Sequence, residues 1–330
     1  MKEEQNHFIK NIEIKNFKCF ENFSAEGFGR VNLIGGKNNV GKTAFMEAVY
    51  VNVHSKNTKQ FTYSTYCLKM VREKINILMQ PNINYKDKFM EQSNQIFTAS
   101  NIHKTFFEIK EIDSVKKYYF NLNDKEILVN FKEFSFDIEV VPNIIFIDNF
   151  GLSTDEIINN YSAIQKKDEE SYLNNLLGKL DSRIKTFKVI YEKPQCKVNN
   201  KYFEITEFGD GVRHLISIVT SIYKAENGYL FIDEIDNGIH YTMLDELWRV
   251  VLDVSEKLNV QVFATTHSKE CIESFNRVQQ EIQDKEGKEG KDTYYFEMYR
   301  NIRKDNITMR KIDEEQLAYE LKQGKGFRGE

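Results

Sequence analysis

The sequence has few cysteines, and no two of them lie close together. The four are Cys19, Cys67, Cys196 and Cys271, and they form no CxxC pair. Clustered cysteines are typical of disulfide frameworks and zinc sites. We therefore expect isolated, reduced thiols and neither kind of site.

Long apolar runs and an excess of one charge are also lacking. No apolar run approaches the roughly 20 residues needed to cross a bilayer. The charged residues 1–17 do not have the apolar core of a secretory signal. The 46 basic and 50 acidic side chains give a formal net charge of −4, so the whole chain does not attract nucleic acid. These observations predict a soluble, cytoplasmic protein without a membrane partner.

The first half of the 330-residue chain contains strand, loop and helix patterns in turn. Residues 8–20 alternate apolar and polar side chains, which predicts an exposed edge strand. The apolar run 30–34 predicts a buried strand, and 43–54 predicts a helix. The polar stretch 55–104 predicts a weakly amphipathic helical insertion, whereas 105–147 predicts antiparallel strands. The chain has no internal repeat.

In the second half, strands alternate with helices, which indicates a parallel sheet with helices on its faces. A short helical subdomain precedes it at 153–181, where Ser153 is a candidate cap. The predicted strands are 184–191, 202–206, 229–232 and 260–265, and the predicted helices are 211–225, 241–257 and 269–277. Within 280–330, the charged residues 280–292 predict a mobile loop, followed by a hairpin (293–300 with 306–312) and a short helix.

A phosphate-binding loop is the most specific motif of the sequence. Its residues fit GxxxxGK[ST] between the predicted strand 30–34 and helix 43–54; they are Gly36, Lys37, Asn38, Asn39, Val40, Gly41, Lys42 and Thr43. The glycines let backbone N–H groups face phosphates, and the next helix presents its positive end to them. Lys42 is expected to reach the β- and γ-phosphates, and the Thr43 hydroxyl to bind Mg²⁺. A plain strand-to-helix turn is the alternative.

Two acids follow the buried strand 229–232. Asp233 is expected to hold Mg²⁺ through water, and Glu234 to accept a proton from the attacking water. Any strand that ends at solvent can carry acids, so this interpretation depends on the phosphate loop. The Asp-Glu pair indicates an ATPase with a base in the site. A GTPase would need an NKxD sequence that reads the nucleotide base, and the chain has none.

A histidine and a glycine-rich turn complete the candidate site. His267 follows the strand 260–265, at the end of the sheet where ligands bind in open α/β folds, so we interpret it as a γ-phosphate sensor. Gly209, Asp210 and Gly211 precede the predicted helix 211–225, whose start can offer N–H groups to an anion. An ordinary turn remains the alternative for these three residues.

The order of four segments resembles a known family. LIGGKNNVGKT, EFGDGVRHL, LFIDEIDNGIHY and FATTHS are similar to the AAA ATPase domain of the SMC/OLD branch of ABC-type ATPases. The resemblance covers nearly the whole chain and is specific at 8–50 and 200–275. It implies one α/β ABC-type P-loop head over residues 1–330. Such a head has a mixed N-terminal lobe with antiparallel strands and a parallel-sheet core flanked by helices.

The resemblance also implies ATP, Mg²⁺ and a role for each matched residue. Lys42 and Thr43 take the Walker A roles, Asp233 and Glu234 the Walker B roles, His267 the switch role, and Lys18 a place near the nucleotide. Gly209, Asp210 and Gly211 match the signature loop that reaches the γ-phosphate bound to another protomer, with Asp236 and Asn237 in the dimer-contact loop. Gly209 stands where the family has serine, so only backbone contacts to the phosphate remain. Gln95 and Gln165 are both open candidates for the Q-loop glutamine.

The chain departs from its larger relatives in two ways. Residues 153–181 are too short for the long coiled coil of SMC proteins, and no DxD metal motif of a TOPRIM domain follows residue 275. We therefore expect a stand-alone ATPase head that assembles with itself as an ATP-sandwich dimer or a higher homo-oligomer.

Two biological roles follow as hypotheses. The first is a regulatory ATPase that controls a separately encoded effector, such as a nuclease, in prokaryotic anti-phage defence; this role comes from the resemblance. The second is a DNA-binding repair or genome-maintenance ATPase. Its support is a basic segment with one acid, Glu192, and six bases: Arg183, Lys185, Lys188, Lys193, Lys197 and Lys201. Such a segment is also typical of a solvated strand. For a third class, a metabolic ATPase, the sequence offers no substrate pocket.

Overall fold

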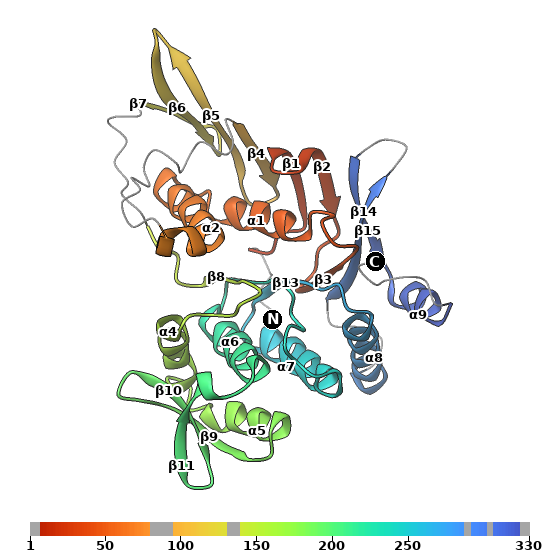
Figure 1. Cartoon of the computed structure of the whole chain (residues 1–330). Helices are drawn as coiled ribbons and strands as arrows, with labels where there is room; N and C mark the ends of the chain where they lie inside the picture. Colours follow the sequence, from red (N-terminus) through yellow and green to blue (C-terminus); the bar gives the residue numbers. More distant parts are fainter. Residues whose placement is uncertain (1–6, 80–94, 131–138, 287–291, 302–305, 324–330) are drawn as a thin grey trace.

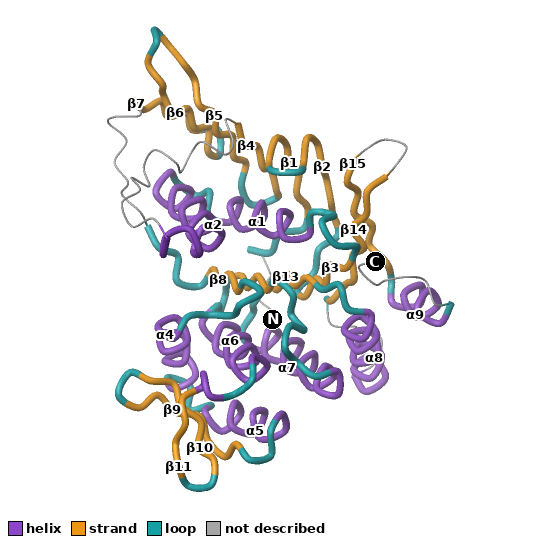
Figure 2. The backbone as a smooth tube through the Cα atoms, viewed as in Figure 1, coloured by secondary structure: helices purple, strands orange, loops and turns teal. Residues whose placement is uncertain are grey.

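The computed structural model describes residues 7–79, 95–130, 139–286, 292–301 and 306–323. Its described strands form an antiparallel sheet, a mostly parallel core sheet and a small third sheet. Figure 1 shows α1 and α2 between the antiparallel sheet and the core sheet, with α6, α7 and α8 on the other face of the core sheet. Figure 2 shows the same layers coloured by secondary structure. This arrangement confirms the predicted α/β fold class.

The antiparallel sheet belongs to the N-terminal lobe, with strand order β2-β1-β4-β5-β6-β7. The strands are β1 (Asn11–Phe17), β2 (Phe20–Glu26), β4 (Gln95–Ser100), β5 (Lys104–Ile112), β6 (Val115–Leu122) and β7 (Lys125–Asn130). The single edge strand expected at 8–20 is wrong. The chain turns at Lys18, which has a positive φ of 52°, so β1 pairs with β2 on one side and β4 on the other.

Two helices cover the inner face of this sheet. They are α1 (Lys42–Val53) and α2 (Thr58–Met79). The sheet buries alternate side chains against them, including Ile14, Phe107 and Phe120, because successive residues of a strand point to opposite faces. The helical insertion expected at 55–104 is therefore only partly right: α2 lies there, but so does the strand β4, and residues 80–94 lie outside the described residues.

The core sheet has the order β15-β14-β3-β13-β12-β8. Its strands are β3 (Val31–Gly35), β8 (Ile144–Ile147), β12 (Tyr229–Ile232), β13 (Gln261–Thr265), β14 (Thr293–Asn301) and β15 (Asn306–Ile312). All neighbours are parallel except β14 and β15, which form the predicted hairpin. Residues 144–147 were expected in the antiparallel series; they lie instead in the parallel core. Parallel pairing brings the carboxyl ends of β3, β12 and β13 to the same edge.

The helices α6 (Asp210–Lys224), α7 (Leu244–Lys257) and α8 (Lys269–Glu286) lie on the far face of the core sheet (Figure 1). The helices α4 (Thr154–Gln165) and α5 (Glu170–Leu180) pack on α6, and α9 (Glu314–Lys322) packs on α8. Short 3₁₀ turns at η1 (Ile205–Glu207) and η2 (Tyr241–Met243) precede α6 and α7. The predicted cap at Ser153 is confirmed, since Ser153 and Glu156 form a capping box. The loop expected at 280–292 is wrong as far as Glu286, which is still helical; 287–291 lie outside the described residues.

The third sheet corrects another expectation. Strands β9 (Ile184–Ile190), β10 (Lys193–Val198) and β11 (Lys201–Glu204) form a separate antiparallel sheet, not part of the parallel core. The strand β10 has no counterpart in the sequence prediction, because Pro194 and its polar neighbours hide its pattern. The short connections, 191–192 and 199–200, favour antiparallel pairing, since parallel strands need a long crossover.

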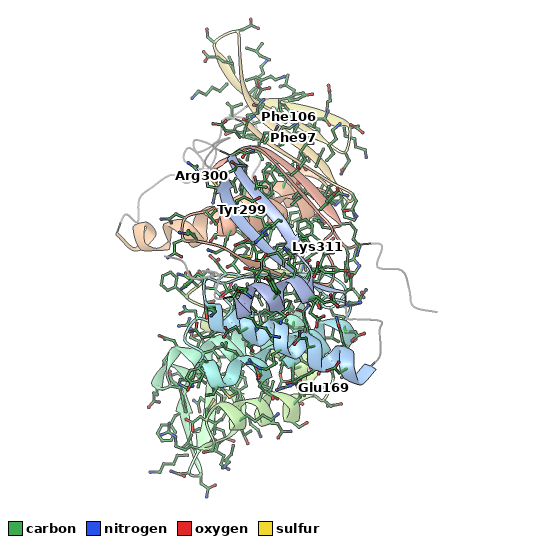
Figure 3. The ribbon with its side chains drawn as sticks, turned by 90° about the vertical axis from the view of Figure 1, so that its right-hand side faces the viewer. Phe97, Phe106, Glu169, Tyr299, Arg300 and Lys311 are labelled. Atoms are coloured by element: carbon green, nitrogen blue, oxygen red, sulfur yellow. The ribbon has the colours of Figure 1, made fainter. Side chains whose placement is uncertain are left out.

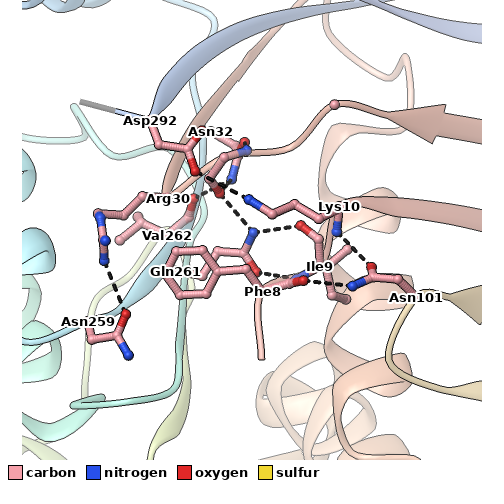
Figure 4. A network of polar contacts seen from close by, with 12 residues as sticks. Phe8, Ile9, Lys10, Arg30, Asn32, Asn101, Asn259, Gln261, Val262 and Asp292 are labelled. Carbon is pink, nitrogen blue, oxygen red and sulfur yellow. Dashed lines mark hydrogen bonds and ion pairs between the residues drawn. The ribbon is translucent and has the colours of Figure 1, made fainter. Parts of the chain in front are cut away.

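Buried polar side chains join the N-terminal segment to the core sheet. Figure 4 shows Gln261 at the start of β13, where it exchanges two hydrogen bonds of 2.8 Å with the backbone of Ile9. Its side-chain amide also donates to the carbonyl of Gly29 at 2.8 Å. Asn32 in β3 donates to the carbonyl of Val262 at 3.2 Å. These contacts satisfy backbone groups that would otherwise be buried without partners, and they fix β3 and β13 in register.

The hairpin β14–β15 lies beside the N-terminal lobe. Figure 3 shows Phe97 and Phe106 on the antiparallel sheet and Tyr299 and Lys311 on the hairpin. The ammonium of Lys311 donates to the carbonyl of Gly27 at 3.1 Å, which ties the hairpin to the turn after β2. Among the described helices, none is both long and apolar enough to span a membrane.

Candidate nucleotide-binding site

The phosphate loop begins where β3 ends and runs into α1. Gly36 and Gly41 have φ angles of 144° and 103°, in the region that favours glycine. A Cβ atom at Gly41 would lie 2.9 Å from the Cys19 sulfur, and one at Gly36 would overlap the carbonyl of Met298. Both positions therefore need glycine for backbone conformation and for space. The structure supports the strand–loop–helix context that the motif requires.

Lys42 closes over the loop from the first turn of α1. Its ammonium donates to the carbonyls of Gly36 at 2.8 Å and Lys37 at 2.9 Å. Burial lowers the pKa of Lys42, while the charges of Asp233 and Glu234 act in the opposite direction. The ammonium is thus partly withdrawn from water, which strengthens its attraction for a phosphate.

Three elements converge on Asp233, at the carboxyl end of β12. The Thr43 hydroxyl, at the start of α1, lies 3.1 Å and 3.0 Å from the two carboxylate oxygens. The hydroxyl of Thr265, at the end of β13, donates to Oδ1 at 2.6 Å. The backbone N–H of Asp233 donates to the carbonyl of Ile147 at 2.9 Å. The structure thus brings together Thr43 and Asp233, which are 190 residues apart in sequence.

Glu234 is held in an uncommon backbone conformation. Its φ is +54°, a left-handed value that costs a non-glycine residue free energy and is often found at functional sites. Its N–H donates to the hydroxyl of Thr265 at 2.9 Å. The Nδ1 atom of His267 lies 3.5 Å from the Glu234 carboxylate, too poorly placed for a hydrogen bond. That nitrogen is shielded and has no hydrogen-bond partner within the described parts of the chain.

These residues surround an open groove of about 550 Å³. It is lined by Asn38, Asn39, Gly41, Lys42, Thr43, Ala44, Asp233, Glu234 and His267. Gly36 and Lys37 contribute the carbonyls that hold Lys42, and Val40 is buried beneath the loop. Lys18 does not line the groove, since its ammonium pairs with the buried carboxylate of Glu47 on α1.

The candidate signature residues lie outside this groove. Gly209 caps α6, is exposed, and has no atom within 4 Å of where a Cβ would be. Gly211 is buried, and a Cβ there would lie 3.1 Å from the carbonyl carbon of Gly238. The exposed Asp210 lies between them. Within one chain, therefore, Gly209 offers an open helix start, whereas Gly211 serves a backbone contact.

The segment after Glu234 is anchored at both ends. The Thr266 hydroxyl donates to Asp236 at 2.7 Å, and the side-chain amide of Asn237 donates to the carbonyl of Asn149. Neither Q-loop candidate lines the groove: Gln95 accepts a hydrogen bond from Asn16, and Gln165 is exposed at the end of α4.

Two threonines were missed by the sequence analysis. Thr265 links Asp233 to the backbone of Glu234, and Thr266 holds Asp236. The signal was present, because both immediately precede His267 in the TTHS segment. A hydroxyl at a strand end can hydrogen-bond to carboxylates on the neighbouring strand.

The oxygen atoms of the groove fit a magnesium ion. Thr43 and Asp233 supply a hydroxyl and a carboxylate side by side, and Mg²⁺ prefers such hard oxygen ligands. Among the described residues, no group of three or more His, Cys, Asp or Glu forms a metal cage. Mg²⁺ at nucleotide sites typically needs only one or two protein ligands, with phosphates and waters as the rest.

Known proteins share this architecture. Residues 197–273 match a family described as "AAA domain, putative AbiEii toxin, Type IV TA system". The head in "Crystal structure of the SmcHead bound to the C-winged helix domain of ScpA" superposes with a TM-score of 0.52 at 12% identity, covering 93% of this chain and 98% of that one. The chain therefore has the fold of this SMC head, and its residues 197–273 match the AAA family. The resemblance predicted from the four motifs is confirmed.

Two further proteins are similar to this chain. An "ATP/GTP phosphatase" of Helicobacter pylori (strain ATCC 700392 / 26695) is 24% identical over 327 residues, covering 82% of this chain and 88% of that protein. The "SMC head domain from Thermotoga maritima" is 13% identical, covers 92% of this chain and 99% of that chain, and has a TM-score of 0.47.

Proposed function

We propose that this SMC-like ATPase hydrolyses ATP with Mg²⁺ in a site shared between two copies, and thereby controls a separate effector protein. One observation carries the shared site. The phosphate loop, Asp233, Glu234 and His267 line one groove, whereas the open helix start at Gly209 lies outside it. A second copy is needed to bring such a helix start to the nucleotide.

Each residue of the groove has a distinct role in this proposal. The loop N–H groups and Lys42 bind the phosphates, while Thr43 and Asp233 would hold Mg²⁺, which neutralises developing negative charge. Glu234 accepts the proton of the attacking water, and its fixed backbone aims the carboxylate into the groove. His267 orients the γ-phosphate and the water from the neighbouring strand. We assign Lys18 no direct contact, because Glu47 already holds its charge.

Lys42→Ala is expected to lower ATP affinity by more than about a hundredfold. The change removes charge-assisted hydrogen bonds, each of which contributes about 1.5–3 kcal/mol. Calorimetric titration with ATP measures the effect. Lys37→Ala is the matched control, because Lys37 is exposed and contributes only its backbone. Wild-type affinity in Lys42→Ala would mean that the groove is not the phosphate site.

Control of an effector is supported by the descriptions of similar proteins. The matched family is described as a putative toxin of a type IV toxin–antitoxin system, and the SMC head was solved with a domain of ScpA bound to it. We infer a cytoplasmic anti-phage module in a prokaryote, in which residues 1–330 form one ATPase head and the effector is a nuclease. Co-expression with the protein encoded next to it tests this. One joint particle is expected, and separate elution of the two proteins would contradict it.

The second candidate function is direct binding of DNA, and the third sheet favours it. Lys188, Lys197 and Tyr202 share the face opposite the buried Phe187 and Cys196. The Lys197 ammonium lies 5.8 Å from the ring centre of Tyr202. Two of the six bases are paired elsewhere: Arg183 with Asp181 and Lys193 with Glu204.

If this face binds DNA, Lys188→Ala with Lys197→Ala will weaken duplex binding and make it less dependent on salt. Each lost phosphate contact lowers the slope of log K against log salt by about 0.9. Fluorescence anisotropy at several salt concentrations measures both quantities. Lys116→Ala, in an exposed position on β6, serves as the control. An unchanged slope in the double variant excludes this face.

A further inference from the structure

The outermost strand of the core sheet, β8, has a free edge. On one side it pairs with β12, where the carbonyls of Asn143 and Ile147 accept from Tyr229 and Asp233, both at 2.9 Å. No described strand pairs with its other side. Figure 1 shows β8 at the border of the sheet, between α2 and α4. Free edges of this kind are templates for strand addition.

The ladder pattern shows which backbone groups face outward. Alternate residues of a parallel strand bond to the same neighbour, so 143, 145 and 147 face β12, and Ile144 and Phe146 face away. The N–H of Ile144 is already bonded to the carbonyl of Val141, at 3.3 Å. The N–H and C=O of Phe146 have no hydrogen bond to any part of the chain that the structure describes. They are the donor and acceptor that an added strand would use.

A groove of about 580 Å³ follows this edge. Its lining includes Ile144, Ile145 and Phe146, three consecutive residues of the strand. Side chains of a strand alternate between faces, so a hollow that touches three in a row runs along the edge and not over one face. Such an opening exposes the backbone of β8 as well as its side chains.

The two walls of the groove differ in chemistry. The upper wall comes from α1 and α2 and is aromatic or apolar: Tyr50, Tyr63, Tyr66, Cys67 and Leu68. Burial raises the pKa of Tyr63 and of the Cys67 thiol, so this wall is uncharged at neutral pH. The lower wall comes from α4 and the end of α6 and is mostly polar: Ser153, Glu156, Asn159, Asn160 and Lys224.

We propose that this groove binds an extended protein segment as a seventh strand of the core sheet, paired with the free edge of β8. Alternate side chains of that segment enter opposite walls. One set is apolar or aromatic and packs against α2; the other set is polar or charged and meets Glu156, Asn159 and Lys224 on the lower wall. That the segment belongs to the effector rests on the proposed function.

The position of the groove links such a partner to the nucleotide site. The strand β8 contacts β12 directly, and the carbonyl of Ile147 accepts from the N–H of Asp233. A segment bound along β8 is therefore one strand away from the acids that face the nucleotide. Ordering of this edge would be transmitted to Asp233 through the hydrogen bond between its N–H and the carbonyl of Ile147.

A library of random octapeptides displayed on phage, selected against the full chain, tests the proposal. We expect enriched peptides to alternate apolar or aromatic residues with polar ones. We also expect the amide of Phe146 to gain protection from hydrogen exchange when a synthetic selected peptide is added. The amides of Ile145 and Ile147, which face β12, should change little, because they are already in the ladder.

Two variants on the same helix locate the binding. Asn159→Trp places an indole in the groove from an exposed position of α4. It should lower the affinity for the selected peptide by at least about tenfold. Gln165→Trp, exposed on α4 but not lining the groove, should bind as the wild type does. Equal thermal midpoints of the two variants exclude a folding defect.

The proposal is overturned if no alternating peptide is enriched, if both tryptophan variants bind equally, or if Phe146 gains no protection. None of these outcomes depends on nucleotide or on the neighbouring protein. A chain that binds such peptides but forms no particle with its neighbour would refute the effector assignment and leave the groove standing. A joint particle that Asn159→Trp does not disturb would also refute the effector assignment, because the neighbouring protein would then bind elsewhere.

Discussion

Glu234→Gln is expected to hydrolyse ATP about 10²–10⁴-fold more slowly than the wild type, the usual effect of removing a general base. The amide has the shape of the carboxylate but cannot take a proton from water. ATP binding should be nearly unchanged, because Lys42 and the loop backbone remain in place. Phosphate release under saturating ATP measures turnover, and calorimetry measures binding.

Asp233→Asn is the informative comparison. Asp233 contacts the hydroxyls of both Thr43 and Thr265, so its loss should weaken Mg²⁺-dependent binding as well as turnover. If Glu234→Gln loses only turnover and Asp233→Asn also loses Mg²⁺-dependent binding, Glu234 is the base and Asp233 holds the metal. Normal turnover in Glu234→Gln would require another base and would refute the assignment.

Gly209→Arg is expected to abolish hydrolysis while leaving ATP binding intact. The position is exposed and has open space for a side chain, so the chain should fold normally. The arginine would instead block the approach of a second copy. Gly211→Arg is a poorer choice, because its side chain would collide with the backbone of Gly238 in the same chain. A small side chain, in Gly209→Ala, serves as the control and should retain most activity.

Mixing Gly209→Arg with Lys42→Ala sharpens this test. In a head-to-tail dimer of the two variants, one site carries both lesions, while the other joins an intact phosphate loop to an intact helix start. Two inactive proteins should therefore regain ATPase activity when mixed, provided that one repaired site works alone. Normal hydrolysis by Gly209→Arg as a monomer would refute the shared site.

Local motifs let the sequence predict the groove well. Gly36 to Thr43 define a loop by their own spacing, and an apolar strand that ends in Asp233 has few alternatives next to such a loop. The position of His267 follows from the rule that ligands lie at the carboxyl ends of parallel strands. Thr265 escaped notice because its partners, Asp233 and the backbone of Glu234, are distant in sequence.

The strand pairings were harder to predict, for a physical reason. Alternation at 8–20 indicates a strand but not its neighbours, and the turn at Lys18 depends on a left-handed residue that is not glycine. Residues 144–147 are apolar enough for either sheet; pairing with β12, more than 80 residues later, decides the matter. Lys18 itself was expected near the nucleotide. Its ammonium instead pairs with the buried carboxylate of Glu47, and Lys18 does not line the groove.

The contact between Gly211 and Gly238 has a mechanical consequence. The backbones of α6 and of the segment after Glu234 touch there with no side chain between them, so little compressible material separates the two. A displacement of the exposed start of α6 would be transmitted through Gly238 to the strained backbone of Glu234, four residues earlier in the chain. Under the proposed assembly, the nucleotide bound to one copy would then affect Glu234 of the other copy, which hydrolyses that copy's own nucleotide. Hydrolysis at the two sites would therefore be correlated.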